Sequence, residues 1–262
     1  MPNLQFVEDL ACQAGEILRA GFGKKMQIDY KGVIDLVTEM DHRSEQFLVD
    51  GIRRHFPDHQ VITEEAGILP GMDSHTWYID PLDGTINYAH GIPIYTVSVA
   101  YAENGQVIYG VVYDPMQREC FRAARGEGAW LNDTLLHVST PRSLDQSLLV
   151  TGFPYDIRTH PENNLDHYAI FSLCSQGVRR FGSAALDLGY IAAGRVDGFW
   201  EIRIKPWDVA AGGLIAEEAG SKVTNIYGSP DYIVPPCSIL AASPIIHAQM
   251  LDILNQKSSP AA

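Results

Sequence analysis

The sequence has few cysteines, little positive charge and no long uninterrupted apolar run. Its four cysteines, at positions 12, 120, 174 and 237, form no Cys-x-x-Cys pair and have no histidine at zinc-ligand spacing, so we expect reduced thiols. Lysine and arginine number 19 against 32 acidic residues, a net charge of −13 without a basic stripe, which predicts no direct nucleic-acid binding. The longest apolar stretch, residues 92–102, is interrupted by polar residues and falls short of the ~20 residues that span a bilayer. Without a signal-peptide pattern at the start, we expect a cytoplasmic protein that does not enter membranes.

With 262 residues and 46% hydrophobic composition, the chain is long enough to bury a large core. Helical periodicity predicts helices over residues 7–22 and from about 41 to 57, and β-branched or aromatic runs predict strands at 60–63, 77–79, 94–102, 107–113 and 119–123. Asn104-Gly105 and Asp114-Pro115 are turn signals between these strands, which favours an antiparallel sheet. Strand-like and helical runs alternate from about residue 147 to 219, and they are followed by a strand at 239–242 and a helix at 244–254. We therefore predict an α+β subdomain over 1–140, an α/β subdomain over 141–262, and a frayed C-terminal tail.

One segment, Trp77-Tyr-Ile-Asp80-Pro-Leu-Asp83-Gly-Thr85, places two carboxylates where an apolar strand ends. Pro81 fixes the backbone between them, so both side chains and the Leu82 carbonyl are able to converge on a hard cation that prefers oxygen ligands. An ordinary Asp-Gly turn at a strand end explains the segment equally well when it is taken alone.

Acidic residues occur at the end of a strand or the start of a helix at two more places in the chain. Glu64 and Glu65 come directly after an apolar strand, and Asp208 stands at the start of an apolar helix. Taken singly, the glutamates are explained by a solvated strand end and Asp208 by helix capping. Carboxylates at three such places in one chain, two strand ends and one helix start, together predict a metal site.

These motifs resemble the inositol monophosphatase family, within the group that includes fructose-1,6-bisphosphatases. The similarity spans nearly the whole chain and comprises five motifs in the family's order: Asp35-Leu-Val-Thr38 with Asp41, Glu64-Glu65, Asp80-Pro-Leu-Asp83-Gly-Thr85, Gly182-Ser-Ala-Ala-Leu186, and Glu201 ahead of Pro206-Trp-Asp208. The resemblance implies a layered α/β/α/β/α fold and a magnesium-dependent phosphatase, commonly homodimeric and often inhibited by lithium.

Carried over by position, the resemblance also implies site roles. Metal ligands would be Glu64, Asp80, the Leu82 carbonyl, Asp83 and Asp208, and Asp41 and Thr85 together with Glu64 would orient the attacking water. Substrate contacts would come from Asp83, Gly84, Thr85, Gly182, Ser183, Ala184, Glu201 and Asp208. Four carboxylates need more than two divalent ions before the site attracts a phosphate, so we expect two Mg²⁺ ions and a weaker third that arrives with substrate.

The implied substrate is inositol monophosphate or a similar polyol or sugar phosphate. Arg203 and Lys205 depart from the family pattern, and in an extended segment they would share a face with Glu201. If that face lines the site, substrates with a second anionic group come into question, such as fructose 1,6-bisphosphate, NADP or 3′-phosphoadenosine 5′-phosphate. Histidinol phosphate is a further alternative, and a regulatory protein that keeps the fold is another.

Other residues have simpler explanations. Lys31 aligns loosely with a family lysine near the mouth of the active site, but a solvated lysine of a hairpin explains it at least as well, so we leave it out of the site. The histidines lack His-Glu-x-x-His spacing, and Gly182-Ser-Ala lacks the Gly-x-Ser-x-Gly form of a nucleophile elbow. The Asp-x-Asp-Gly-Thr signature of aspartyl-nucleophile phosphatases is one residue shorter than the segment at 80–85, so its spacing argues against that class.

Overall fold

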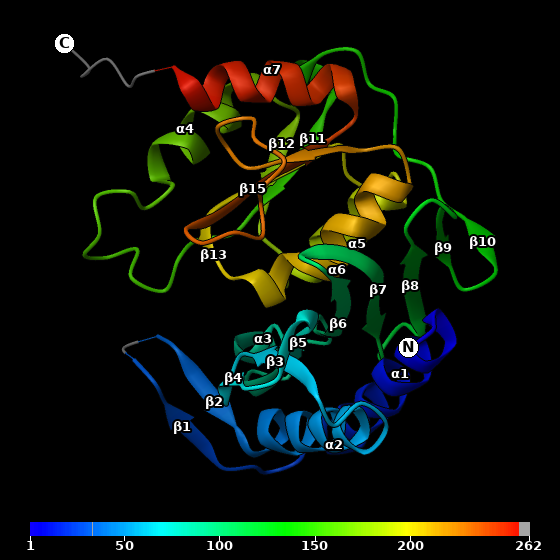
Figure 1. The fold of residues 1–262 in the computed structure, drawn as a ribbon. Helices are drawn as coiled ribbons and strands as arrows, with labels where there is room; N and C mark the ends of the chain where they lie inside the picture. The colour runs from blue at the N-terminus through cyan, green and yellow to red at the C-terminus, as the bar shows by residue number, and fades with distance from the viewer. Residues whose placement is uncertain (33, 257–262) are drawn as a thin grey trace.

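Five layers make up the protein in this computed structural model, which describes residues 1–32 and 34–256 (Figure 1). Two helices cover the outer face of a large sheet, two more lie between that sheet and a smaller one, and the last two cover the smaller sheet. The predicted α/β/α/β/α arrangement is therefore confirmed. The predicted frayed tail at 257–262 lies outside the described residues.

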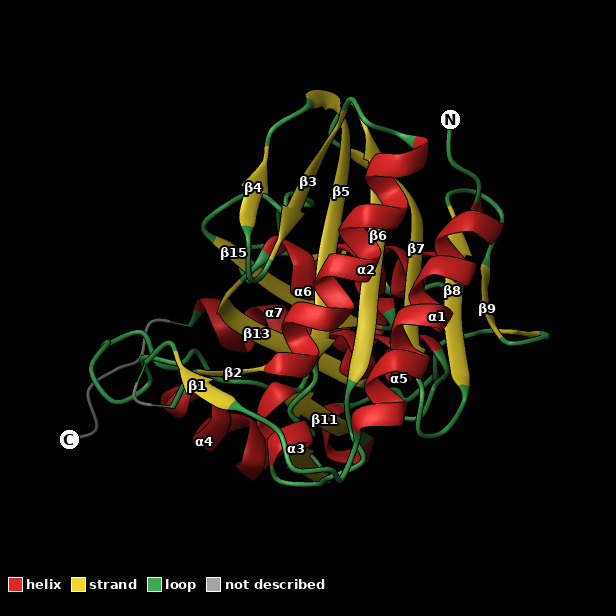
Figure 2. Ribbon diagram, turned by 90° about the horizontal axis from the view of Figure 1, so that it is seen from below, coloured by secondary structure: helices red, strands yellow, loops and turns green. Residues whose placement is uncertain are grey.

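The outer helices are α1 (Leu4–Gly21) and α2 (Glu39–His55). Both are amphipathic, and their buried faces pack on the large sheet around Trp77 and Val99. Thr38 caps α2: its hydroxyl oxygen accepts a hydrogen bond from the Met40 N–H, and the Asp41 carboxylate accepts one from the Thr38 N–H. Figure 2 shows the two helices crossing the same face of the sheet.

The large sheet has eight strands in the order β10-β9-β8-β7-β6-β5-β3-β4. Their bounds are β3 His59–Thr63, β4 Gly67–Leu69, β5 Met72–Asp83, β6 Thr96–Glu103, β7 Gln106–Asp114, β8 Glu119–Ala124, β9 Ala129–Leu131 and β10 Thr134–Leu135. The turn at Asn104-Gly105 joins β6 to β7 with both residues at positive φ, as the dipeptide predicts.

The predicted antiparallel pairing is wrong for one pair of strands in this sheet. β3 and β5 run parallel, with Ile62 opposite Tyr78, because β4 pairs on the far side of β3 and its short hairpin returns the chain to the starting edge. The carboxyl ends of β3 and β5 therefore lie at the same edge of the sheet. This edge is where the acidic residues of both strands occur.

Helices α5 (Ala184–Ala192) and α6 (Pro206–Glu218) form the middle layer. Every residue of α6 from 209 to 216 is buried, because one side of the helix packs on the large sheet and the other on the small sheet. A helix buried on both sides has no polar face, which is why its sequence is apolar all round.

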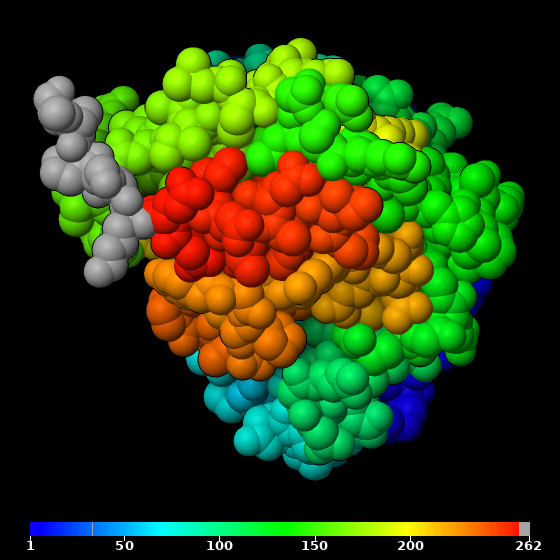
Figure 3. All heavy atoms as spheres, turned by 90° about the horizontal axis from the view of Figure 1, so that it is seen from above, coloured from blue at the N-terminus to red at the C-terminus, as the bar shows by residue number. Residues whose placement is uncertain are grey.

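The small sheet is mixed, in the order β12-β11-β13-β15-β14. Its strands are β11 Leu148–Thr151, β12 Gly177–Arg179, β13 Gly198–Ile204, β14 Lys222–Thr224 and β15 Cys237–Ala242. Helices α4 (Leu165–Cys174) and α7 (Pro244–Asn255) cover its outer face, and α7 lies in full view in Figure 3.

Three small elements complete the described chain: the hairpin β1 (Ile28–Tyr30) and β2 (Leu36–Thr38), helix α3 (Thr85–Ala89), and the 3₁₀ turn η1 (Leu144–Gln146). The sequence patterns did not predict β4, β9, β10 or β14, all of which are only two or three residues long. Within residues 1–32 and 34–256, no helix combines the length and apolar character that crossing a bilayer requires. The subdomain division at residue 140 stays a prediction.

Candidate active site

A cleft of about 990 Å³ opens between the two sheets. One wall comes from the β1–β2 hairpin, the ends of β3 and β5, and α3, and the other from segments 152–156, 180–184 and 201–208. All the residues expected in the site from sequence, except Asp41, line this cleft: Glu64, Asp80, Leu82, Asp83, Gly84, Thr85, Gly182, Ser183, Ala184, Glu201 and Asp208. Asp41 lies just behind the wall, hydrogen-bonded to Thr85.

The end of β5 delivers Asp80 and Asp83 to the cleft. The Asp80 side chain is buried and accepts a hydrogen bond of 3.0 Å from the Leu82 N–H. The Asp83 Oδ2 atom accepts 2.7 Å bonds from the Ser183 hydroxyl and from the Ala185 N–H, at the start of α5. Asp83 thus joins the large sheet to the first turn of a helix in the other half, where backbone N–H groups favour an anion.

A left-handed turn follows directly. Gly84 has φ +99°, and a Cβ there would lie 3.0 Å from the Ile94 carbonyl and 3.2 Å from the Gly182 carbonyl. Gly84 is therefore required both by its backbone conformation and by the close approach of the chain at residue 182. Gly84 and the first residues of α3, Thr85 to Asn87, all line the cleft.

Thr85 and Asp41 form a buried pair. The Thr85 hydroxyl lies 3.1 Å from Asp41 Oδ1 and 3.0 Å from the Leu82 carbonyl oxygen, and it is able to donate its proton to either. Asp41 Oδ2 accepts bonds of 2.8 and 2.7 Å from the Thr38 N–H and hydroxyl. Burial raises the pKa of Asp41 to about 6, although these hydrogen bonds oppose the effect.

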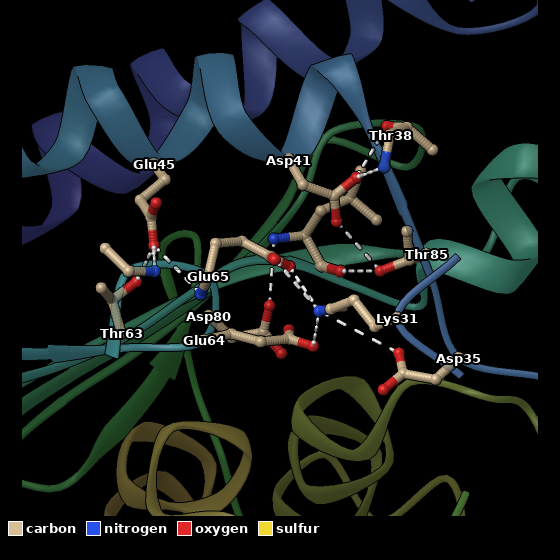
Figure 4. A network of polar contacts seen from close by, with 12 residues as sticks. Lys31, Asp35, Thr38, Asp41, Glu45, Thr63, Glu64, Glu65, Asp80 and Thr85 are labelled. Carbon is tan, nitrogen blue, oxygen red and sulfur yellow. Dashed lines mark hydrogen bonds and ion pairs between the residues drawn. The ribbon is translucent and has the colours of Figure 1, made fainter. Parts of the chain in front are cut away.

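Lys31, which the sequence left open between a site lysine and a solvated hairpin residue, lines the cleft. Its Nζ atom lies 3.1 Å from Glu64 Oε1 and 2.8 Å from Glu65 Oε1, and Figure 4 shows it reaching between these carboxylates and Asp35. The two glutamates lie 33 and 34 residues further along the chain, so no local pattern identifies the contact.

Glu45 fixes the turn that carries Glu64. From the adjacent helix α2, its Oε1 atom accepts hydrogen bonds from the Thr63 hydroxyl at 2.7 Å, the Glu65 N–H at 3.2 Å and the Ala66 N–H at 3.0 Å (Figure 4). One buried oxygen therefore holds the Thr63 side chain before Glu64 and two backbone N–H groups after it. The sequence patterns did not single out this residue.

The cleft concentrates negative charge. Burial and then the neighbouring carboxylates raise the pKa values of Asp80 and Asp208 well above their usual range, and burial raises those of Asp83 to about 6 and Glu64 to about 7. No lysine, arginine or histidine in the described part of the chain pairs with Asp80, Asp83 or Asp208. A set of buried oxygen donors without a counter-charge suits hard divalent cations.

The carboxylate oxygens of the cleft do not converge on one point in this structure. Within residues 1–32 and 34–256, no three carboxylate, imidazole or thiol groups already converge on a single point. Asp208 Oδ2 accepts a bond from the Lys205 N–H at the start of α6, so this side chain also caps its helix. Cation binding would thus require small side-chain rotations, including that of Glu64 away from Lys31.

The far end of the cleft contains two more buried acids. Glu201 on β13 occupies the space beside Gly152, where a Cβ would lie only 2.1 Å from the Glu201 Oε2 atom. Burial raises the pKa of Glu201 to about 8. Asp187 of α5, 2% exposed, also lines the cleft, and its Oδ1 atom has no hydrogen-bond partner within the described residues. Sequence reasoning missed Asp187.

The expectation that residues 201, 203 and 205 share one face is wrong. In the pairing of β13 with β15, Ile202 lies opposite Ser238 and Ile204 opposite Cys237, so Arg203 is an extra residue in a β-bulge. Arg203 has φ +56° and its guanidinium pairs with Asp156. Both Arg203 and Lys205 nevertheless line the cleft.

Comparisons with protein families, individual sequences and solved structures all match this chain to the same family. The model of the inositol monophosphatase family matches residues 2–259. The "Nus factor SuhB" of Escherichia coli K12 is 40% identical over 99% of this chain and 98% of its own length, and the "Inositol-1-monophosphatase" of Synechocystis is 42% identical over 96% and 88%. The solved inositol monophosphatase from Anabaena superposes with a TM-score of 0.87 at 44% identity, covering 97% of this chain and 95% of that one.

Proposed function

Because this chain belongs to the inositol monophosphatase family, we propose that it is a magnesium-dependent phosphomonoesterase that hydrolyses inositol monophosphate or a similar small polyol or sugar phosphate. The observation that carries the proposal is the meeting of four carboxylates from three separate elements, the ends of β3 and β5 and the start of α6, in one cleft. They lie beside a turn whose N–H groups suit a phosphate.

The carboxylates supply the cation ligands. Glu64, Asp80 and the Leu82 carbonyl would hold one Mg²⁺, Asp80, Asp83 and Asp208 a second, and Glu64 would also face a weaker third. Magnesium supplies a lowered pKa for water and charge stabilisation for the leaving alkoxide. Because the ligands carry four negative charges, we expect a sigmoidal rather than linear dependence of rate on magnesium.

Asp41 and Thr85 position the water. When the Thr85 hydroxyl donates to the buried Asp41 carboxylate, its own oxygen is free to accept a hydrogen bond from a water in the cleft. Asp41 thus fixes the direction in which Thr85 accepts, and Glu64 completes the orientation of the water toward phosphorus.

The second wall binds the substrate's alcohol portion. The turn at Gly84-Thr85 would receive phosphate oxygens, and Glu201 would accept hydrogen bonds from substrate hydroxyls. Gly182, Ser183 and Ala184 bring the start of α5 against the same turn, since Ser183 donates to Asp83.

Further proposals rest on family membership: a homodimer, inhibition by lithium, and subdomains that divide near residue 140. Multi-angle light scattering of the purified chain tests the dimer, and a mass matching one chain of 28.9 kDa would reject it.

A regulatory or binding role is the second candidate function. Two observations favour it: several relatives are named Nus factors, and α4 exposes apolar side chains, among them Leu173 at 90%. The phosphate-release experiment described next discriminates between the phosphatase and the binding role.

Phosphate release is measured from inositol 1-phosphate, fructose 1,6-bisphosphate, histidinol phosphate and 3′-phosphoadenosine 5′-phosphate, with magnesium and with chelator. We expect magnesium-dependent turnover that Asp83→Asn abolishes and that Asp252→Asn, on the exposed side of α7, leaves unchanged. No turnover by folded, magnesium-loaded protein would reject the phosphatase proposal and favour the binding role.

A further inference from the structure

Arg203 has an unusual backbone and an unusual position. It is the extra residue of a β-bulge, and its φ of +56° lies in the left-handed region that glycine adopts most easily. Although the bulge removes Arg203 from the regular alternation of β13, its side chain lines the cleft, as Glu201 does. A non-glycine residue in this conformation at a cleft wall suggests that the side chain has a use there.

The guanidinium of Arg203 already binds an anion in the two-pronged geometry that arginine favours. Its Nη1 atom donates to Asp156 Oδ1 at 2.8 Å, and its Nη2 atom donates to Asp156 Oδ2 at 2.6 Å. Asp156 lies on the loop that follows β11, and this loop also lines the cleft. The two side chains are 32% and 42% exposed, so a ligand in the cleft is able to reach them.

Two more cations stand on the same wall. Arg180 and Lys205 are exposed, line the cleft, and have no carboxylate partner in the described part of the chain. With Arg203 they make three positive charges, and of the three only Arg203 is paired with a carboxylate. The wall therefore carries as many cations as the acids Asp156, Glu201 and Asp208, although the whole chain carries −13.

This wall continues the binding site of the proposed reaction. Arg203 comes two residues after Glu201, and the Lys205 N–H donates to Asp208. A phosphomonoester whose phosphate sits at the Gly84 turn and whose hydroxyls face Glu201 would thus point the remainder of the molecule toward the guanidinium.

Resting on the proposed function, we propose that Arg203, with Lys205 and Arg180 on the same wall, forms a subsite for a second anionic group, and that the substrate class includes sugar or nucleoside bisphosphates. Asp156 provides the anion for the guanidinium in the free protein and is displaced by the substrate's second phosphate. An arginine fork that fits a carboxylate also fits a phosphate.

The experiment compares substrates that differ only in the second phosphate. Fructose 1,6-bisphosphate and fructose 1-phosphate share the phosphate to be cleaved, so the ratio of their kcat/KM values reports the subsite. We expect Arg203→Gly to lower this ratio about 10- to 100-fold, the usual effect of losing a hydrogen-bonded charge partner. Glycine suits the positive φ, so the variant should fold. Asp156→Asn should raise the ratio, because it removes the competing carboxylate.

Arg195→Gln is the matched control. Arg195 forms a similar two-pronged pair with Glu119, at 2.6 and 2.5 Å, but does not line the cleft, so the ratio should stay at the wild-type value. If the ratio of kcat/KM values is unchanged in Arg203→Gly, the subsite proposal is overturned. The ion pair between Arg203 and Asp156 would then only hold the loop that follows β11 in place.

Binding is measured in the same samples to separate this inference from the proposed function. If the wild-type protein hydrolyses neither compound, the phosphatase proposal fails on its own. The subsite then stands if fructose 1,6-bisphosphate raises the Tm of the wild-type protein but not that of Arg203→Gly, and it falls if both respond equally.

Discussion

Replacing Asp41 with asparagine should change how stability depends on pH. The Asp41 side chain is fully buried and accepts hydrogen bonds from Thr38 and Thr85. Burial raises its pKa from 3.8 to about 6, so the folded protein favours the protonated carboxyl while the unfolded chain favours the ionised one. Asparagine keeps the shape of the side chain and cannot ionise.

The sign follows from proton linkage. Because the folded state holds this proton more tightly, Asp41 contributes stability that is present below pH 4 and is lost as the pH rises through 6. The full loss amounts to roughly 3 kcal/mol, of which about 1.5 kcal/mol falls between pH 5 and pH 8. The Asp41→Asn variant should be spared this loss.

The assay is chemical unfolding of wild-type protein, Asp41→Asn and the surface control Asp252→Asn, each in chelator at pH 5, 6, 7 and 8. The free energy of unfolding of Asp41→Asn, relative to wild type, should rise by about 1.5 kcal/mol from pH 5 to pH 8, while the control follows the wild-type curve. Parallel curves for wild type and Asp41→Asn would refute the reasoning. Phosphatase activity of Asp41→Asn should fall at least about 100-fold, because a neutral amide replaces the ionised carboxylate that orients the Thr85 hydroxyl.

Three further outcomes are expected. Glu45→Ala should release the turn around Glu64 and raise the magnesium concentration for half-maximal rate about tenfold. Glu45→Gln keeps the accepting oxygen and should raise that concentration less. The same increase in both variants would contradict the positioning role of Glu45. Gly152→Ala places a Cβ 2.1 Å from the Glu201 Oε2 atom, so kcat/KM for inositol 1-phosphate should fall and stability should drop by about 1–3 kcal/mol, measured by urea unfolding. Phe171→Ala removes a buried ring that packs on Trp200 at 4.4 Å and should destabilise the fold by about 3–5 kcal/mol without changing kcat at low temperature.

Features with a local cause were predictable from the sequence. The long helices follow from apolar periodicity, and the hairpin at Asn104-Gly105 follows from two residues that tolerate positive φ. The five-layer order came from the resemblance to a family rather than from periodicity.

Features that depend on the path of the chain were not predictable. The direction of β3 relative to β5 depends on where β4 pairs, and the contact of Lys31 with Glu64 joins positions 33 residues apart. The bulge at Arg203 reverses the alternation on which the expected face of residues 201–205 was based, because a single extra residue moves the following side chain to the other side of the sheet. Candidate site residues were found where carboxylates end apolar strands, while Asp187 and Glu45 lie inside helices and carry no such signal.

The double burial of α6 has a consequence for the order of events during synthesis. The segments that carry Glu64, Asp80 and Asp83 are synthesised well before α6, so Asp208 joins them only when α6 enters the space between the two sheets. The fourth carboxylate is therefore added late, when burial of the apolar residues 209–216 of α6 provides the driving force to bring it near the other three. A nascent chain is thus spared the full repulsion of the site, and the complete set of cation ligands exists only in molecules whose two halves have already joined.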